Sequence, residues 1–311
     1  MQTGLLIYPN HNMELLKRLK HLSIINYRLL NLNRNNFDFI SEITYEYWIR
    51  DYFSKYAYVL DQAEANYTST QYSNKIWQLW YQGFDNAPQL VKRCIESVNE
   101  FSNGQEAILL NEKNIEHYVS IPGYVYDKKK SGKISNAGFS DLLRACLLAE
   151  HGGTWCDSTI FLTNKLSSPM KDSSLFCFST TPRDFRGLEN IFASSWFIQA
   201  QPNHVIMQIT RDLLLEYWKI EDKNRHYYVF HLFFSLAITM NEACKKEWDK
   251  VPFYSNVPPQ VLQMELFKDY EEVRYKQIKE MSSIHKLTFY GGKEFDTYKK
   301  GTFYDVIING K

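Results

Sequence analysis

One acidic residue inside an apolar run constrains the fold of this chain more than any other feature. In residues 152–163, GGTWCDSTIFLT, two glycines precede a β-branched and aromatic segment that contains Asp157. Gly152 and Gly153 can supply the left-handed turn that ends a helix, and residues 155–161 predict a buried strand. Because an unpaired buried carboxylate costs several kcal/mol, Asp157 must be there to meet a partner or a ligand.

Strands and helices alternate from about residue 74 to residue 165. Segments of strand length occur at 75–83 and 106–111, and segments of helical periodicity occur at 88–101 and 136–153. Such alternation predicts an α/β layer with a mainly parallel sheet, in which ligands bind at the carboxyl ends of the strands. Further strands are predicted at 174–180 and 194–201, and further helices at 203–219, 227–246 and 259–281.

The first 72 residues are predicted to form a separate, mostly helical region. Leucines repeat at helical spacing over residues 13–33, and residues 37–63 continue without Gly or Pro. Between Glu14 and Arg34, five basic residues stand against one acid, a composition typical of a helix that docks on an anionic membrane surface. The alternative is a helix that packs on the rest of the protein and leaves its basic face in water.

Composition excludes several classes of protein. The formal net charge of +1 over 311 residues gives no reason to expect a nucleic-acid partner. No apolar run reaches the ~18 residues that span a bilayer, and the start of the chain lacks the regions of a signal peptide. Five scattered cysteines without C-x-x-C spacing argue against a disulfide framework or a zinc site. The predicted compartment is the cytoplasm.

Three charged groups are predicted to converge at one end of the layer. Asp141 and Arg144 share a face near the first turn of the helix at 136–153. That helix climbs about 14 Å beyond Asp141, and the strand returns about 13 Å to Asp157. Carboxylates accept from sugar hydroxyls and arginine engages phosphate, so the site suits a phosphorylated, hydroxyl-rich ligand. The structural alternatives are an ion pair within the helix and a helix cap.

Residues 138–162, GFSDLLRACLLAEHGGTWCDSTIFL, resemble the SDLLR-GG-W-D-T stretch of the bacterial capsular polysaccharide synthesis glycosyltransferases. These are relatives of the DXD-containing mannosyl- and galactosyltransferases. Three further blocks occur in the family's order along the chain: NKIWQLWYQGFDNAPQLVKRCIESV, YYVFHLFFSLAI and SSIHKLTFY. The resemblance therefore covers most of residues 73–290. It implies an α/β protein of the GT-A glycosyltransferase fold over residues 73–311. A Rossmann-like nucleotide-binding layer with a mixed sheet would carry the N-terminal helical region and C-terminal helices.

The resemblance also implies roles in binding the sugar donor. Asp141 and Arg144 would grip hydroxyls of the donor sugar, and Asp157 would stand as the first acid of a DXD motif and contact the ribose and the diphosphate. Trp80 would stack on uracil, although Trp77 competes with it for this role. Thr159 and Lys286 complete the predicted donor site, with Lys286 as a diphosphate contact or, alternatively, a solvated lysine.

On the acceptor side the resemblance points to His231 and Trp196. For His231 the alternative is a satisfied core histidine, because it lies in a strongly apolar helix. For Trp196 the alternative is a plain buried strand. The predicted acceptor is a lipid-linked or oligosaccharide molecule.

A cation site is predicted less directly. Thr159 replaces the second acid of the DXD motif, which weakens the two-carboxylate case for a divalent cation. His285 could complete the shell, so Asp157 and His285 are the predicted protein ligands. This mixed oxygen and nitrogen shell favours Mn²⁺ over Mg²⁺. The alternative is metal-independence, with Lys286 and a helix N-terminus carrying the charge of the diphosphate.

The function implied by the resemblance is that of a retaining glycosyltransferase in capsule or exopolysaccharide repeat-unit synthesis. It would move a hexose from a nucleotide diphosphate sugar, a UDP-hexose by preference, at the inner face of the cell membrane. No residue is assignable as a nucleophile, so a front-face reaction is expected. The alternatives are a non-catalytic carbohydrate-binding or scaffolding protein on this fold, and a sugar-phosphate transferase.

Overall fold

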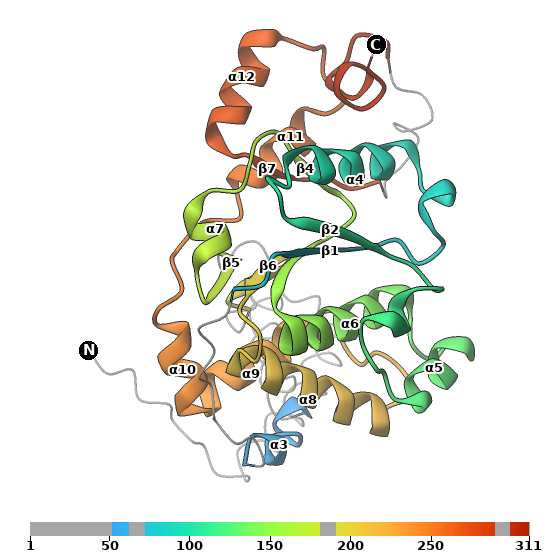
Figure 1. Cartoon of the computed structure of the whole chain (residues 1–311), viewed down its shortest axis with the longest axis vertical. Helices are drawn as coiled ribbons and strands as arrows, with labels where there is room; N and C mark the ends of the chain where they lie inside the picture. The colour runs from blue at the N-terminus through green and yellow to red at the C-terminus, as the bar shows by residue number, and fades with distance from the viewer. Residues whose placement is uncertain (1–51, 62–71, 181–190, 290–298, 311) are drawn as a thin grey trace, which may run out of the picture.

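A five-stranded mixed sheet forms the centre of the structure, a computed structural model that describes residues 52–61, 72–180, 191–289 and 299–310 (Figure 1). The strands are, in spatial order, β2 (Glu106–Leu110), β1 (Lys75–Leu79), β3 (Gly153–Cys156), β6 (Ala193–Ala200) and β5 (Leu175–Ser179). β1 runs parallel to β2 and β3, whereas β6 is antiparallel to β3 and β5. The predicted parallel arrangement is confirmed for three strands, and the sheet as a whole is mixed.

Helices cover both faces of this sheet (Figure 1). One face packs against α6 (Asn136–His151), α8 (Val205–Ile220) and α9 (Val229–Met240). The other faces α4 (Gln89–Phe101) and a small antiparallel sheet of β4 (Ile160–Leu162) and β7 (Ile284–Lys286). The shorter elements are α3 (Tyr58–Asp61), α5 (Gly123–Lys130), α7 (Ser168–Asp172), α10 (Glu242–Trp248), α11 (Val261–Glu265), α12 (Glu272–Met281), η1 (Phe84–Asn86), η2 (Ile115–His117), η3 (Pro258–Gln260) and η4 (Tyr304–Ile308).

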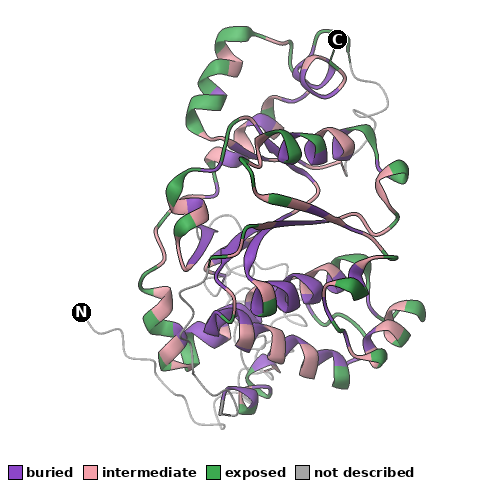
Figure 2. Ribbon diagram, in the orientation of Figure 1, coloured by how far each residue is buried: buried purple, intermediate pink, exposed green. Residues whose placement is uncertain are grey.

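The central strands divide their side chains between two cores because successive residues of a strand point to opposite faces. Trp77 and Trp155 pack with α6, α8 and α9, whereas their neighbours Ile76 and Cys156 join the core under β4. All four side chains are buried, and the inner strands in Figure 2 are buried on both faces.

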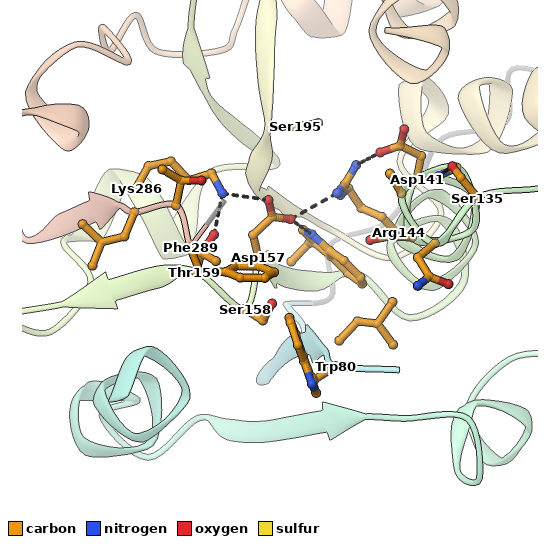
Figure 3. A pocket seen from close by; sticks show the side chains of 18 of the residues that line it. Trp80, Ser135, Asp141, Arg144, Asp157, Ser158, Thr159, Ser195, Lys286 and Phe289 are labelled. Atoms are coloured by element: carbon orange, nitrogen blue, oxygen red, sulfur yellow. Dashed lines mark hydrogen bonds and ion pairs between the residues drawn. The ribbon is translucent and has the colours of Figure 1, made fainter. Parts of the chain in front are cut away.

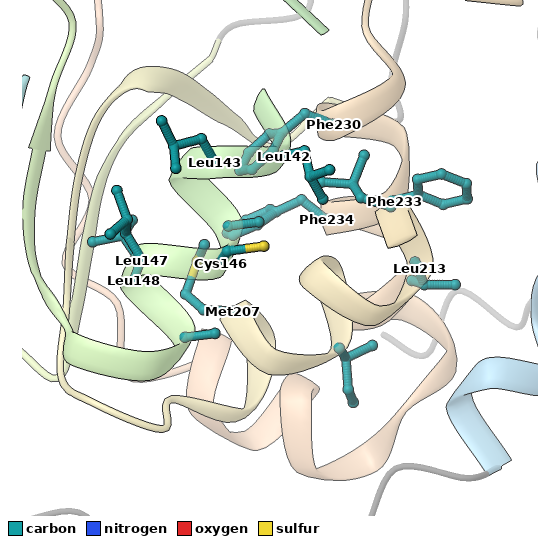
Figure 4. Packing of buried hydrophobic residues seen from close by; sticks show 14 of the residues in the cluster. Leu142, Leu143, Cys146, Leu147, Leu148, Met207, Leu213, Phe230, Phe233 and Phe234 are labelled. Carbon is teal, nitrogen blue, oxygen red and sulfur yellow. The ribbon is translucent and has the colours of Figure 1, made fainter. Parts of the chain in front are cut away.

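The larger core is made by α6 against α8 and α9. Leu142, Leu143 and Leu147 of α6 are fully buried; Leu142 lies on the side of Phe230 and Phe234 of α9, and Leu143 and Leu147 project from the other side of the helix (Figure 4). Removing one such leucine side chain typically lowers the free energy of unfolding by about 2–5 kcal/mol. This packing fixes α6, the helix that carries Asp141 and Arg144, against the sheet.

Two glycines join α6 to β3, as the sequence predicts. Gly152 and Gly153 have φ angles of 62° and 91°, which L side chains rarely adopt. A Cβ on Gly152 would lie 2.5 Å from the nitrogen of Pro202, and one on Gly153 would lie 2.5 Å from the carbonyl oxygen of Lys75. The chain can therefore turn directly from the helix into the middle of the sheet only with glycine at both positions.

The single strand predicted over residues 155–161 is wrong. β3 ends at Cys156, and a turn closed by a hydrogen bond from Ile160 N to Asp157 O, 2.9 Å long, leads to β4 in the other sheet. The amide of Asp157 still donates to Trp196 O of β6 at 2.9 Å, so it forms the last rung of the main sheet. Asp157 thus lies at the carboxyl end of β3.

Two predicted helices are also interrupted. The helix expected over 227–246 breaks at Asn241, whose side chain accepts from the amides of Ala243 and Cys244 and so caps α10. The helix expected over 259–281 is divided into η3 and α11, followed by α12. The remaining predicted strands and helices of residues 75–219 are present within a few residues of their expected bounds.

Of the predicted N-terminal helical region, the structure describes residues 52–61. Phe53 and Tyr56 are buried, and both rings contact Tyr217 of α8 and Phe233 of α9. The basic stretch at 14–34 and its predicted membrane contact lie outside the described residues, and the boundary after residue 72 stays a prediction. Among the helices that the structure describes, none has the length and hydropathy to cross a membrane.

Glu221, at the end of α8, ties residues 52–61 to the rest of the fold. Its carboxylate accepts from Lys55 at 2.8 Å, Arg225 at 2.7 Å and Tyr56 at 3.1 Å, and also from the hydroxyl of Tyr52. Burial opposes ionisation, but these four donors outweigh it and lower the pKa of Glu221 to about 2.

We expect Glu221→Gln to reduce the free energy of unfolding by about 2 kcal/mol near pH 7, a value that allows for the half-exposed Lys55 and Arg225. The folded-state pKa of about 2 lies below the ordinary 4.5. This contribution is therefore fully present above pH 4.5 and is lost as the pH falls toward 2. Urea unfolding of both proteins across this range measures it. A difference that stays constant down to about pH 3 would contradict the role of the ionised carboxylate.

Candidate active site

A cavity of about 660 Å³ opens at the carboxyl edge of β1 and β3. Its walls come from the end of β1, the start of α6, the turn after β3, Ser195 of β6, His231 of α9, and residues 286–289, which begin with the last residue of β7. This is where a ligand is expected in an α/β sheet, because the parallel strands end together there. Figure 3 shows the charged side chains that line it.

The first turn of α6 faces this cavity. Ser135 caps the helix by accepting a hydrogen bond from the amide of Gly138 at 3.1 Å, and residues 135–138 are all part of the lining. The free amides of a helix N-terminus favour negative charge. Asp141 lies in the second turn of this helix, which begins at Asn136 as predicted.

Arg144 is the central cation of the site. Its side chain is 4% exposed and lies between the rings of Trp155 and Phe230, at 4.9 and 5.1 Å from their centroids. Nη1 donates to Asp141 Oδ1 at 2.6 Å, and Nη2 donates to Asp157 Oδ1 at 3.2 Å. The predicted convergence of these three groups is confirmed. Within the described residues, the Nε of Arg144 is buried without a hydrogen-bond partner.

Asp157 is held by cations on both sides (Figure 3). Oδ1 also accepts from the indole of Trp155 at 2.9 Å, and Oδ2 accepts from Lys286 Nζ at 3.3 Å. Burial opposes ionisation of this carboxyl, but Lys286, Arg144 and the Trp155 hydrogen bond outweigh it and keep the pKa of Asp157 below its ordinary value. Asp141 differs, because its burial exceeds the effect of Arg144 and raises its pKa.

The pairing of β4 with β7 brings Lys286 to this position. Ile160 lies opposite Lys286 in the register, and the amide of Leu287 donates to Thr159 O at 3.0 Å. Nζ of Lys286 donates to the hydroxyl of Thr159 at 2.5 Å. Lys286 is therefore an ordered, partly buried member of the site.

The two candidate tryptophans are separated by the geometry. Trp77 is fully buried and donates to Gly152 O at 2.8 Å, so it belongs to the core. Trp80 lines the cavity, with Phe289 edge-on at 5.4 Å. Its indole Nε1 is buried and has no hydrogen-bond partner among the described residues. Of the two, Trp80 is placed to stack on a ligand.

The alternation of side chains along a strand decides which predicted residues of β6 and β7 enter the cavity. His285 lies on the other side of β7 from Lys286, fully buried, with its ring beside Phe161 and its Nε2 3.1 Å from Thr163 Oγ1. Trp196 likewise turns away from Ser195 and stacks on a phenylalanine of β5. Neither His285 nor Trp196 lines the cavity, because one-residue steps along a strand reverse the direction of the side chain.

His231 does line the cavity. It lies on α9, edge-on to Tyr228 at 5.3 Å. Burial, assisted by the nearby charge of Arg144, lowers its pKa to about 3. A neutral imidazole therefore faces the pocket near pH 7.

The two protein ligands predicted for a divalent cation, Asp157 and His285, do not lie together. His285 does not reach Asp157, and Thr159 supplies a hydroxyl in place of an acid. Both carboxylate oxygens of Asp157 already accept from cationic or indole donors. Among the described residues, no group of three or more His, Cys, Asp or Glu side chains is arranged to hold a metal ion. The use of Mn²⁺ or Mg²⁺ stays a prediction from the resemblance.

Several lining residues were not predicted from the sequence. Tyr227 at the mouth is 75% exposed and Met264 is 66% exposed, although both are large and apolar. Trp155 and Phe289 join the site through contacts with Arg144 and Trp80. The only sequence signal for Phe289 was its place in the segment SSIHKLTFY.

Fold and cavity together define an α/β protein with a charge-paired pocket at the carboxyl edge of a mixed sheet. A family model described as capsular polysaccharide synthesis protein matches residues 31–307, and the chain belongs to this family. The solved structure titled PaToxG Glycosyltransferase is similar over 77% of this chain and 98% of its own, with 10% identity and a TM-score of 0.40. The search of curated proteins gave no match. The predicted family membership is thus confirmed.

Proposed function

We propose that this protein is a retaining glycosyltransferase of the GT-A type that transfers a hexose from a UDP-sugar to a lipid-linked or oligosaccharide acceptor. One observation carries the proposal. An aromatic platform, an acid–arginine pair and a lysine beside a carboxylate line a single cavity at the carboxyl edge of the sheet. Family membership supports a role in capsule synthesis. The location at the cytoplasmic face of the membrane is part of the proposal.

The donor would lie across the cavity from Trp80 toward α6. The uracil would stack on Trp80, and the diphosphate would lie by Lys286 and Thr159, which are hydrogen-bonded to each other. The sugar hydroxyls would meet Asp141 and Arg144 near the start of α6. These side chains are already paired and ordered, so little rearrangement is needed when the donor binds.

Transfer in this arrangement breaks the bond between the anomeric carbon and the phosphate oxygen and forms one to the acceptor hydroxyl oxygen. The acceptor proton passes to the departing phosphate oxygen, and UDP leaves. Lys286 and Arg144 stabilise the negative charge that develops on the diphosphate. The neutral His231 and Ser195 border the space left for the acceptor.

Incubation with a panel of UDP- and GDP-sugars tests the proposal. We expect one UDP-sugar to raise the melting temperature and to release UDP slowly, by transfer to water, when no acceptor is present. The mass of the product separates hexose transfer from the transfer of a sugar phosphate. If no nucleotide sugar binds or turns over, the result favours the alternative of a non-catalytic carbohydrate-binding protein.

Trp80→Ala is expected to weaken UDP binding about tenfold, because stacking of a base on an aromatic ring contributes about 1–3 kcal/mol. Trp77→Phe is the matched control. It removes the hydrogen bond to Gly152 O in the core and should lower the melting temperature while leaving UDP affinity unchanged. Calorimetric titration with UDP measures both variants. If Trp77→Phe weakened binding more than Trp80→Ala, the assignment of the platform would be reversed.

A further inference from the structure

The side chain of Lys286 contacts both Asp157 and Thr159, the residues that correspond to the two acids of a DXD motif. Nζ lies 3.3 Å from Asp157 Oδ2 and 2.5 Å from Thr159 Oγ1. These are the side chains at the first and third positions of the motif. A metal ion bound to Asp157 Oδ2 would lie about 2.0–2.2 Å from that oxygen. A cation that bridges Asp157 and Thr159 would therefore displace the ammonium group.

The charges of this arrangement match those of a metal site. Two carboxylates with a divalent cation are neutral in sum, and so is one carboxylate with one ammonium group. Replacement of the second acid by Thr159 and addition of Lys286 therefore leave the local net charge unchanged. A hydroxyl in place of an acid is also what an ammonium group needs, because it accepts a hydrogen bond without adding a second negative charge.

Lys286 also keeps a donor for a ligand. An ammonium group has three N–H donors, of which Asp157 and Thr159 take two. The side chain is 26% exposed and lines the cavity, so the third donor can face an anion there. Pairing of β7 with β4 fixes the backbone on both sides of this residue.

We propose that Lys286 supplies at the donor diphosphate the positive charge that a divalent cation supplies in DXD enzymes, so that the nucleotide binds without metal. This rests on the proposed function, since it assigns the charge partner of the diphosphate in the same site. Arg144, on the other side of Asp157, adds the second cation.

Calorimetric titration of the full chain with UDP, in EDTA and in Mn²⁺, tests this proposal. The wild type should bind with the same affinity in both buffers. Lys286→Met should bind about tenfold more weakly in EDTA, because a charged hydrogen bond is lost, whereas Lys286→Arg should keep most of the affinity. The matched control is Lys75→Met, which removes a strand lysine paired to Glu106 at 3.0 Å outside the cavity. It should leave binding unchanged.

The double variant Thr159→Asp with Lys286→Met restores two acids and removes the ammonium group. We expect it to bind UDP only when Mn²⁺ is present. UDP binding by the wild type that requires Mn²⁺ would overturn the inference and leave the proposed function standing. Absence of UDP binding in both buffers would instead remove the proposed function. Titration with inorganic pyrophosphate in EDTA then tests the role of Lys286 separately from the nucleotide. The inference fails if Lys286→Met binds pyrophosphate as tightly as the wild type does.

Discussion

Asp157→Asn is expected to lower turnover by about 10²–10³-fold while the protein stays folded. The asparagine oxygen can still accept from Arg144 and Trp155, but its amide group directs N–H donors at Lys286, where the carboxylate accepted a hydrogen bond. Both cations lose the charge that positions them, so the transition state loses preorganised stabilisation. Initial-rate kinetics with the UDP-sugar identified by screening measure the effect.

Asp269→Asn is the matched control for this substitution. Asp269 also pairs with a lysine, Lys299, at 2.8 Å, but its side chain is 71% exposed and lies outside the cavity. Turnover of this control should equal that of the wild type. Near-wild-type turnover of Asp157→Asn, together with an unchanged melting temperature, would remove Asp157 from the active site.

Arg144→Met should cause the largest loss of stability among the site variants, about 3 kcal/mol, together with a large fall in kcat/KM. The variant leaves Asp141 and Asp157 facing each other without the guanidinium that bonds both. Because Arg144 is 4% exposed, water cannot take its place fully. Urea unfolding and steady-state kinetics measure the two effects.

The pH dependence of this stability loss follows from Asp157. The pKa of Asp157 is lowered in the folded wild type, so its ionised form stabilises the fold. This contribution is fully present at pH values above the ordinary aspartate pKa and is lost as the pH falls. The difference between wild type and Arg144→Met should therefore narrow in acid. Arg211→Met, which breaks a partly exposed pair with Asp212, serves as the control and should lower stability by less than about 1 kcal/mol. Equal losses in the two variants would contradict the role of Arg144.

The sequence predicted those parts of the fold that depend on local periodicity. The helix at 136–153 and its glycine stop follow from spacing and backbone freedom, and they suffice to bring Asp141, Arg144 and Asp157 together. The break after Cys156 could not be predicted in this way, because residues 155–161 all favour a strand. It depends on the pairing of Ile160–Leu162 with β7, a strand far away in the sequence.

In the candidate site too, the sequence predicted which residues are involved, but contacts between distant segments decide which side chains enter the cavity. The sequence named both His285 and Lys286, but only the register of β7 against β4 decides which of the two adjacent side chains enters the cavity. Trp77 and Trp80 were indistinguishable by type and position near the end of a strand. Burial under α6 and α8 assigns Trp77 to the core, and this depends on packing between elements far apart in sequence.

Because β4 pairs with β7, the candidate site is completed only late in the synthesis of the chain. Asp157 leaves the ribosome 129 residues before Lys286. The parallel strands and α6 can form while the carboxylate still lacks one of its two cations and the cavity lacks its far wall. A chain interrupted before residue 284 contains all five strands of the sheet β2-β1-β3-β6-β5 but lacks Lys286, the contact proposed above for the diphosphate. Under the proposed function, unfinished chains should therefore not bind the nucleotide sugar.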